Sequence, residues 1–181
     1  MSAHSFGIRT ASDLLDKAER ELHRYRKAVS DTPQDLQKQS DHAFNFVITA
    51  WHVTDWVWRE TENGKGSWHG CKSFKEFVSK VRSECQALKI CHELATGSKH
   101  FHIREKQAQT VAKTDTKTTI GGGVLRPALR PVLRPALSSA FGGYTVPGLV
   151  IKLKSNATRK PTDVFEQALD YWKEKLCGKE T

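Results

Sequence analysis

The sequence contains no long hydrophobic run. None of its 181 residues belongs to a stretch of about 18 consecutive apolar residues, the length that a membrane-spanning helix needs. Residues Met1–Phe6 do not form a charged head followed by an apolar core, so we expect no secretory signal. A hydrophobic content of 38% and a mean hydropathy of −0.56 fit this view. The sequence therefore predicts a cytoplasmic protein that has no membrane partner.

Motifs for several kinds of chemistry are also missing. There is no C-x2-C pair, no glycine-rich loop followed by Lys-Ser or Lys-Thr, and no serine nucleophile elbow. Six side chains are of the types that bind zinc, but their spacing matches no zinc finger or zinc ribbon. These are His69, Cys71, Cys91, His92, His100 and His102. We therefore expect neither a metal ion nor a cofactor.

The chain has four cysteines, which on count alone could form two disulfides. Cys85 and Cys91 fall on apolar helical positions, where a thiol acts as a small hydrophobic side chain. A cytoplasmic protein also rarely keeps disulfides. We expect free, reduced cysteines.

Apolar periodicity predicts a mainly helical fold in one domain, residues 1–181. We expect a helical bundle over residues 10–100, a basic strand and loop insert over 101–160, and a closing helix over 161–177. A break near Ser83–Gln86 would give the bundle four helices before the insert instead of three. Thr32 and Pro33 have the pattern of a cap and a first helical residue. The helix that they would open is rich in tryptophan, and we expect Trp51 and Trp58 to be buried between helices.

Within the insert, Phe101 and Ile103, and later Thr116, Thr118 and Ile120, alternate as short strands do, and residues 145–154 form a clearer strand. We expect a small hairpin or a short-strand insert, in which strands 101–106 and 149–154 are candidate partners. Between these stretches, Leu-Arg-Pro occurs three times at a period of four, starting at Leu125. Proline at every fourth position forbids a regular helix or a central strand. Two explanations stay open: duplication tolerated in a surface loop, or a phosphate-binding arm.

Charge is distributed unevenly along the chain. Residues 101–160 carry eleven Lys and Arg against two acidic residues, whereas the rest of the chain has eighteen of each sign. The entire net charge of +9 therefore belongs to this segment. A concentrated basic segment is typical of a phosphate-binding surface. The residues that we expect to contact RNA are Lys99, Arg104, Lys106, Arg126, Arg130 and Arg134.

In the stretch Leu88–Phe101, apolar residues at helical spacing are followed by polar side chains. Gly97 lies between the two parts and is expected to stop the helix. The sequence from Glu93 to His100, Glu-Leu-Ala-Thr-Gly-Ser-Lys-His, resembles the last bundle helix of HEPN-like domains. These are small prokaryotic helical proteins, many of them ribonucleases or nucleotide-binding partners in toxin and antiphage systems. Nuclease members have an arginine a few positions before the histidine; here that place holds His92 or Glu93. The resemblance implies a HEPN-like bundle, and for a nuclease a site shared across a homodimer.

A candidate site combines this stretch with a polar stripe on the tryptophan-rich helix. The stripe consists of Asn45, Thr49, His52, Asp55 and Arg59. One interpretation is that these groups form hydrogen bonds across the bundle or face a polar groove. In the other interpretation, Asp55 and Arg59 face His92, Glu93 and His100 and form a pocket with them. A histidine in this pocket would move protons while an RNA 2′-hydroxyl attacks its phosphate, without a metal ion. Lys99 or Arg59 would stabilise the negative charge of the phosphorane.

Two function classes follow. The first is an RNA-directed protein of a toxin or antiphage system, which would be a metal-independent endoribonuclease if it is an enzyme. The second is a non-catalytic interaction module that binds a partner protein or a nucleotide.

Overall fold

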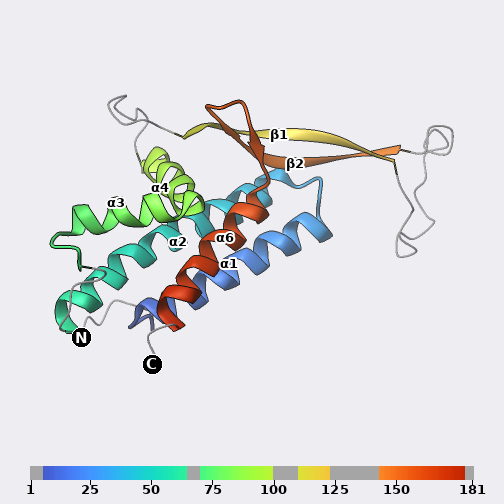
Figure 1. Cartoon of the computed structure of the whole chain (residues 1–181). Helices are drawn as coiled ribbons and strands as arrows, with labels where there is room; N and C mark the ends of the chain where they lie inside the picture. Colours follow the sequence, from blue (N-terminus) through green and yellow to red (C-terminus); the bar gives the residue numbers. More distant parts are fainter. Residues whose placement is uncertain (1–5, 65–69, 100–109, 123–142, 178–181) are drawn as a thin grey trace.

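The computed structural model describes residues 6–64, 70–99, 110–122 and 143–177. In this part of the chain, helices come first, a small sheet follows, and a helix closes the fold (Figure 1). The elements are α1 (Ala11–Asp31), α2 (Leu36–Gly64), α3 (Phe74–Glu84), α4 (Gln86–Lys99), β1 (Val111–Gly122), β2 (Gly143–Leu153), β3 (Thr158–Arg159) and α6 (Pro161–Cys177). The prediction of a mainly helical protein with a small strand insert before the last helix is confirmed.

Helix α1 begins at a reciprocal cap. The backbone N–H of Asp13 donates to the Thr10 hydroxyl at 3.0 Å, and the N–H of Thr10 donates to the Asp13 carboxylate at 2.9 Å. This arrangement satisfies N–H groups that have no partner inside the first turn. It also holds the pKa of Asp13 below its usual value, chiefly through the hydrogen bonds from Arg9 and Thr10.

The start of α2 corrects the sequence prediction. Thr32 ends α1, with its N–H and its hydroxyl both donating to the carbonyl of Ala28 at 3.1 Å. Pro33 lies in a turn, and α2 begins only after Asp35. The Asp35 carboxylate accepts from the N–H of Lys38 at 2.9 Å, as a capping side chain does. Thr32 and Pro33 therefore do not open this helix, because Thr32 already serves the preceding one.

The core lies between α1, α2, α4 and α6, and its largest fully buried side chain is Trp172. Phe46 of α2 stacks on Phe165 of α6 with ring centroids 4.1 Å apart. Trp51 and Trp58 are only half-buried, so the prediction that they are buried between helices is wrong. Trp51 packs on His92 and Trp58 stacks on Phe77, and both rings pack against the core while they stay partly exposed.

Of the two alternatives for this part of the bundle, the structure has the one with a break, at Cys85, which has an extended backbone between α3 and α4. Ser73 caps α3 by accepting from the N–H of Glu76 at 3.2 Å. Helix α4 then continues through Gly97 to Lys99, so Gly97 does not stop it as expected.

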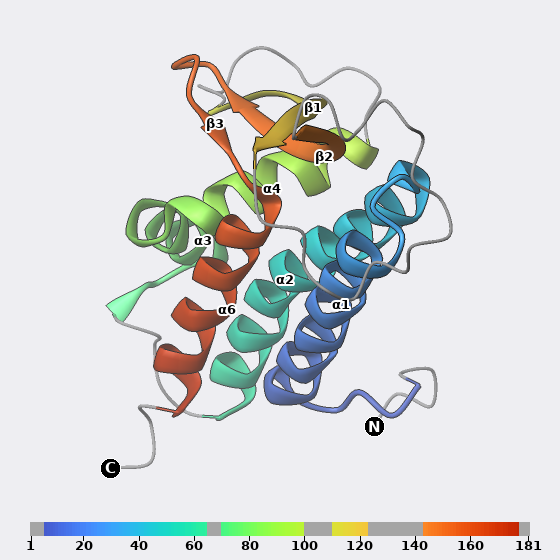
Figure 2. The same cartoon turned by 90° about the vertical axis from the view of Figure 1, so that its right-hand side faces the viewer.

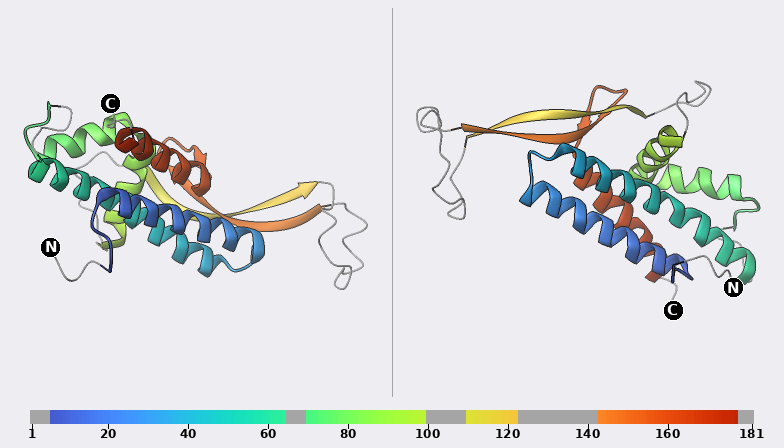
Figure 3. Two further views of the ribbon diagram at one scale, coloured as in Figure 1. Left: turned by 90° about the horizontal axis from the view of Figure 1, so that it is seen from below. Right: turned by 180° about the vertical axis from the view of Figure 1, so that it is seen from behind.

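Strands β1 and β2 pair antiparallel over their whole length, and β3 adds a short third strand in the order β1-β2-β3. Ile151 of β2 pairs with Thr114 on one side and with Arg159 on the other. Residues 149–153 therefore pair with 111–116 of β1, and the alternation at 116–120 correctly indicated a strand. Residues 101–106, the candidate partner from the sequence, lie outside the described residues. Figure 1 and both views of Figure 3 show β1 and β2 as a ribbon whose far end extends beyond the helices.

The underside of the sheet completes the core. Ile151 and Leu153 of β2 are buried against the helices. Figure 2 shows α4 and the first turn of α6 directly below the strands. Among the described helices, none combines the length and the apolar character that crossing a membrane requires.

Candidate functional site

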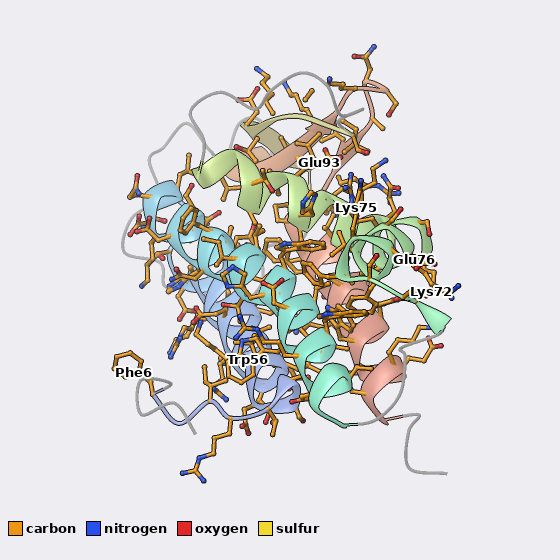
Figure 4. The ribbon with its side chains drawn as sticks, turned by 90° about the vertical axis from the view of Figure 1, so that its left-hand side faces the viewer. Phe6, Trp56, Lys72, Lys75, Glu76 and Glu93 are labelled. Carbon is orange, nitrogen blue, oxygen red and sulfur yellow. The ribbon has the colours of Figure 1, made fainter. Side chains whose placement is uncertain are left out.

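The C-terminal half of α4 meets the sheet through one carboxylate. Glu93 is only 8% exposed, and Figure 4 shows it on the side of α4 next to the strands. Its carboxylate accepts from the backbone N–H of Thr110 at 2.7 and 2.8 Å and from that of Val111 at 2.7 Å. Buried charge is costly unless it receives such bonds. Glu93 therefore fixes the point at which β1 begins.

A cavity of about 440 Å³ opens beside this contact. Helices α2, α4 and α6 form its floor and sides, and β1 and β2 cover it. Its lining is mostly aliphatic and aromatic, with Glu93, Ser40, Lys113 and Thr114 as polar members. A volume of this size falls within the range of small-molecule sites.

His92 lies on a different side of α4, against the Trp51 ring, with ring centroids 4.4 Å apart. Burial, and after it the nearby cation of Arg82, lower the pKa of His92 to about 4, although the Glu93 carboxylate acts in the opposite direction. Nδ1 of His92 is buried and has no hydrogen-bond partner among the described residues. At neutral pH the imidazole is thus uncharged, so His92 can accept a proton but cannot act as a general acid.

The residues of the polar stripe on α2 differ in burial and in what they face. Thr49 is buried and its hydroxyl accepts from Nζ of Lys17 at 2.9 Å, so it faces α1. Asp55 is half-buried and Arg59 is exposed near the far end of α2. For Thr49, the interpretation of a hydrogen bond across the bundle is confirmed. The roles of Asp55 and Arg59 beside a reacting phosphate stay predictions.

Several sequence-predicted site residues lie outside the described residues. Lys99 ends α4, but its side chain is not described. The others are His100, Arg104, Lys106, Arg126, Arg130 and Arg134. Their proposed contacts with RNA, and the role of His100 in proton transfer, therefore stay predictions.

The described part of the basic insert presents cations on the sheet and just after it. Asp115 pairs with Lys113 at 3.0 Å and with Lys152 at 2.8 Å. Lys154, Arg159 and Lys160 are exposed and form no ion pair with another described residue. Three cations of the basic segment are thus available at the surface near the base of the ribbon.

Sequence reasoning missed Arg82 and the backbone donors of Thr110 and Val111. Arg82 is half-buried, and its Nε has no hydrogen-bond partner within the described part. Nothing in its sequence spacing relates Arg82 to His92, because the two lie on different helices. The backbone donors carry no residue-type signal at all, so only the fold could reveal them.

Across the described residues, no group of three or more His, Cys, Asp or Glu is arranged to hold a metal ion. Cys71, Cys85 and Cys91 are buried and free. Burial raises the pKa of the Cys85 and Cys91 thiols, which keeps both groups protonated. No protein-family model, curated protein or solved structure matches the chain.

The low pKa of His92 predicts a stability that depends on pH. The unfolded chain binds a proton at His92 below a pKa of about 6.5, whereas the folded protein does so only below about 4. The contribution is therefore present above pH 6.5 and is lost as the pH falls towards 4. For a half-buried group screened by solvent, we expect about 1–2 kcal/mol.

Urea denaturation at pH 7 and pH 4 measures this contribution as the difference between the protein and its His92→Phe variant. The phenyl ring keeps a contact with Trp51 but does not titrate. His23→Gln, at an exposed histidine, serves as the matched control and should lose stability with pH as the unaltered protein does. Equal pH dependence in the protein and in His92→Phe would contradict the assignment.

Proposed function

We propose that this protein binds RNA through its basic ribbon and the segment that connects the two strands. The supporting observation is that the whole charge excess of the chain belongs to residues 101–160, and that β1 and β2 of this segment extend beyond the helices (Figure 3). A projecting basic ribbon can approach a phosphate backbone without a clash from the bundle. Salt-dependent attraction to phosphates then supplies the affinity.

Three of the described cations have the exposure, and lack the acidic partner, that contact with phosphate requires. Lys154, Arg159 and Lys160 are exposed near the base of the ribbon, and no acidic side chain of the described residues pairs with them. Asp115 holds Lys113 and Lys152 in place, which gives that part of the sheet a net charge of one. The free cations are therefore the ones that we expect to contact phosphate.

Geometry favours single-stranded RNA as the ligand. The major groove of an A-form helix is deep and narrow, so a two-stranded ribbon does not enter it. Unpaired RNA can instead wrap along the ribbon and bring successive phosphates to its cations.

The sequence resemblance to HEPN-like domains adds a cellular role and a reaction to RNA binding. It places the protein in a toxin or antiphage system and, if the protein cleaves RNA, gives it a homodimeric, metal-independent site. His100 is then the residue that moves the proton. The low pKa of His92 supports giving it no more than a secondary part as a base.

RNA binding should depend steeply on salt and on the free cations at the base of the ribbon. Fluorescence anisotropy of a labelled single-stranded RNA, titrated between 50 and 200 mM salt, measures the slope of log K against log salt. Lys154→Gln, Arg159→Gln and Lys160→Gln together should reduce that slope by up to about 2, because each lost phosphate contact removes about 0.7. The same reduction is expected when Arg126, Arg130 and Arg134 are changed to Gln.

Lys27, Lys38 and Lys72, exposed in the helical part, provide a control with the same change of charge. Their replacement by Gln should leave the slope nearly unchanged. Affinity that does not depend on salt, or equal effects of the three triple variants, would contradict binding through the ribbon.

Catalysis has its own test. If the protein cleaves RNA, cleavage should persist in the presence of a chelator and should be lost in His100→Ala, because imidazole would transfer the proton in the chemical step. His4→Ala is a control far away in sequence. Cleavage that survives His100→Ala, or that requires added metal, would refute the mechanism and leave RNA binding untouched.

A further inference from the structure

The cavity between the sheet and the helices has a chemistry that RNA binding does not use. It measures about 440 Å³ and lies where β1 and β2 pass over α2, α4 and α6. Of its lining side chains, Phe44 is 49% exposed and Lys113 is also exposed, so these two mark the side open to solvent. Glu93 is buried and marks the inner side.

The walls require an apolar ligand body. Val47 and Ile48 of α2, Leu94 of α4, and Leu149 of β2 contribute aliphatic surface, and Phe165 of α6 contributes a ring. Placing apolar ligand atoms against such walls removes surface from water at roughly 25 cal/mol per Å². A small aromatic or branched aliphatic group satisfies this requirement, whereas a sugar does not.

The charge inside the cavity requires a cationic or strongly donating end. An ionised carboxylate offers about four acceptor sites, and Glu93 uses three of them on Thr110 and Val111. It forms no ion pair with a cation of the described residues. Lys113, the other charged group of the lining, is bound to Asp115 at 3.0 Å. The inner end of the cavity is therefore negative.

We propose that this cavity binds a small organic cation, with an apolar body against the helices and an ammonium group that donates to the Glu93 carboxylate. A charge-assisted hydrogen bond in a site shielded from water is stronger than the same contact at the surface. The site rejects anions, so a nucleotide phosphate is not its ligand. This inference stands independently of RNA binding, because none of the free cations Lys154, Arg159 and Lys160 lines the cavity.

Three probes with one ring system separate the contributions of shape and charge. Tryptamine carries an ammonium group, indole carries no charge, and indole-3-acetate carries a carboxylate. Isothermal titration of the full chain at pH 7 should give tryptamine an affinity at least about tenfold higher than indole, and indole-3-acetate the weakest binding. Equal affinity of tryptamine and indole-3-acetate, or no binding of any probe at millimolar concentration, would overturn the proposal.

Variants locate the binding. Ala43→Phe places a ring in the cavity and should abolish binding of tryptamine, whereas Ala157→Phe, at an exposed turn outside the lining, should leave it unchanged. Glu93→Gln should bring the affinity for tryptamine down to that for indole. Should Glu93→Gln fail to fold by circular dichroism, the ranking of the three probes on the unaltered protein still decides. Tryptamine binding that persists in Ala43→Phe would place the site elsewhere and refute the proposal.

Discussion

The contact between the Glu93 carboxylate and the first backbone N–H groups of β1 decides how the sheet is attached to the helices. The buried charge would be costly without these hydrogen bonds, and the N–H groups of Thr110 and Val111 need an acceptor because they lie at the start of the strand. Each side satisfies the other. The pair therefore works like a helix cap, except that it joins a helix to a strand instead of serving one helix.

The cavity and the ribbon both depend on this contact. Where β1 starts beside α4, β2 is set by the pairing of Val111 with Leu153 and of Thr114 with Ile151. Ile151 and Leu153 then enter the core, and the rest of the sheet is held above α2, which leaves the cavity beneath. The outer parts of β1 and β2 continue past the helices as a ribbon (Figure 1). A two-stranded ribbon has little stability by itself, so its anchored end matters most.

The helices were predictable from the sequence because their information is local. The spacing of apolar residues predicted the helical bundle over 10–100 and the closing helix, observed as α6, and it left open the break that the structure places at Cys85. Thr32 and Pro33 misled because a threonine at the end of one helix has the same pattern as a cap at the start of another. Alternation at 116–120 indicated part of β1, but it could not show which strand pairs with β2, since pairing depends on the anchor at Glu93 and not on alternation alone.

The candidate site was predictable only in part. The count of charges identified a basic segment without any knowledge of the fold, and three of its cations, Lys154, Arg159 and Lys160, are exposed in the structure. Their contact with RNA stays a prediction. The family resemblance suggested Glu93 as a secondary candidate for catalysis. In the structure, its carboxylate contacts the backbone of Thr110 and Val111. The environment of His92, with Trp51 and Arg82 beside it, comes from three different helices. No periodicity in one segment could reveal it.

Amide hydrogen exchange measured by NMR tests the role of Glu93 most directly. The account predicts that the amides of Thr110 and Val111 are protected in the unaltered protein. In Glu93→Ala both should exchange much faster, while Phe46 and Trp172 in the helical core keep their protection. Glu174→Ala, at an exposed acid of α6, should change neither set. Rapid exchange at Thr110 and Val111 in the unaltered protein, or unchanged protection in Glu93→Ala, would contradict the account.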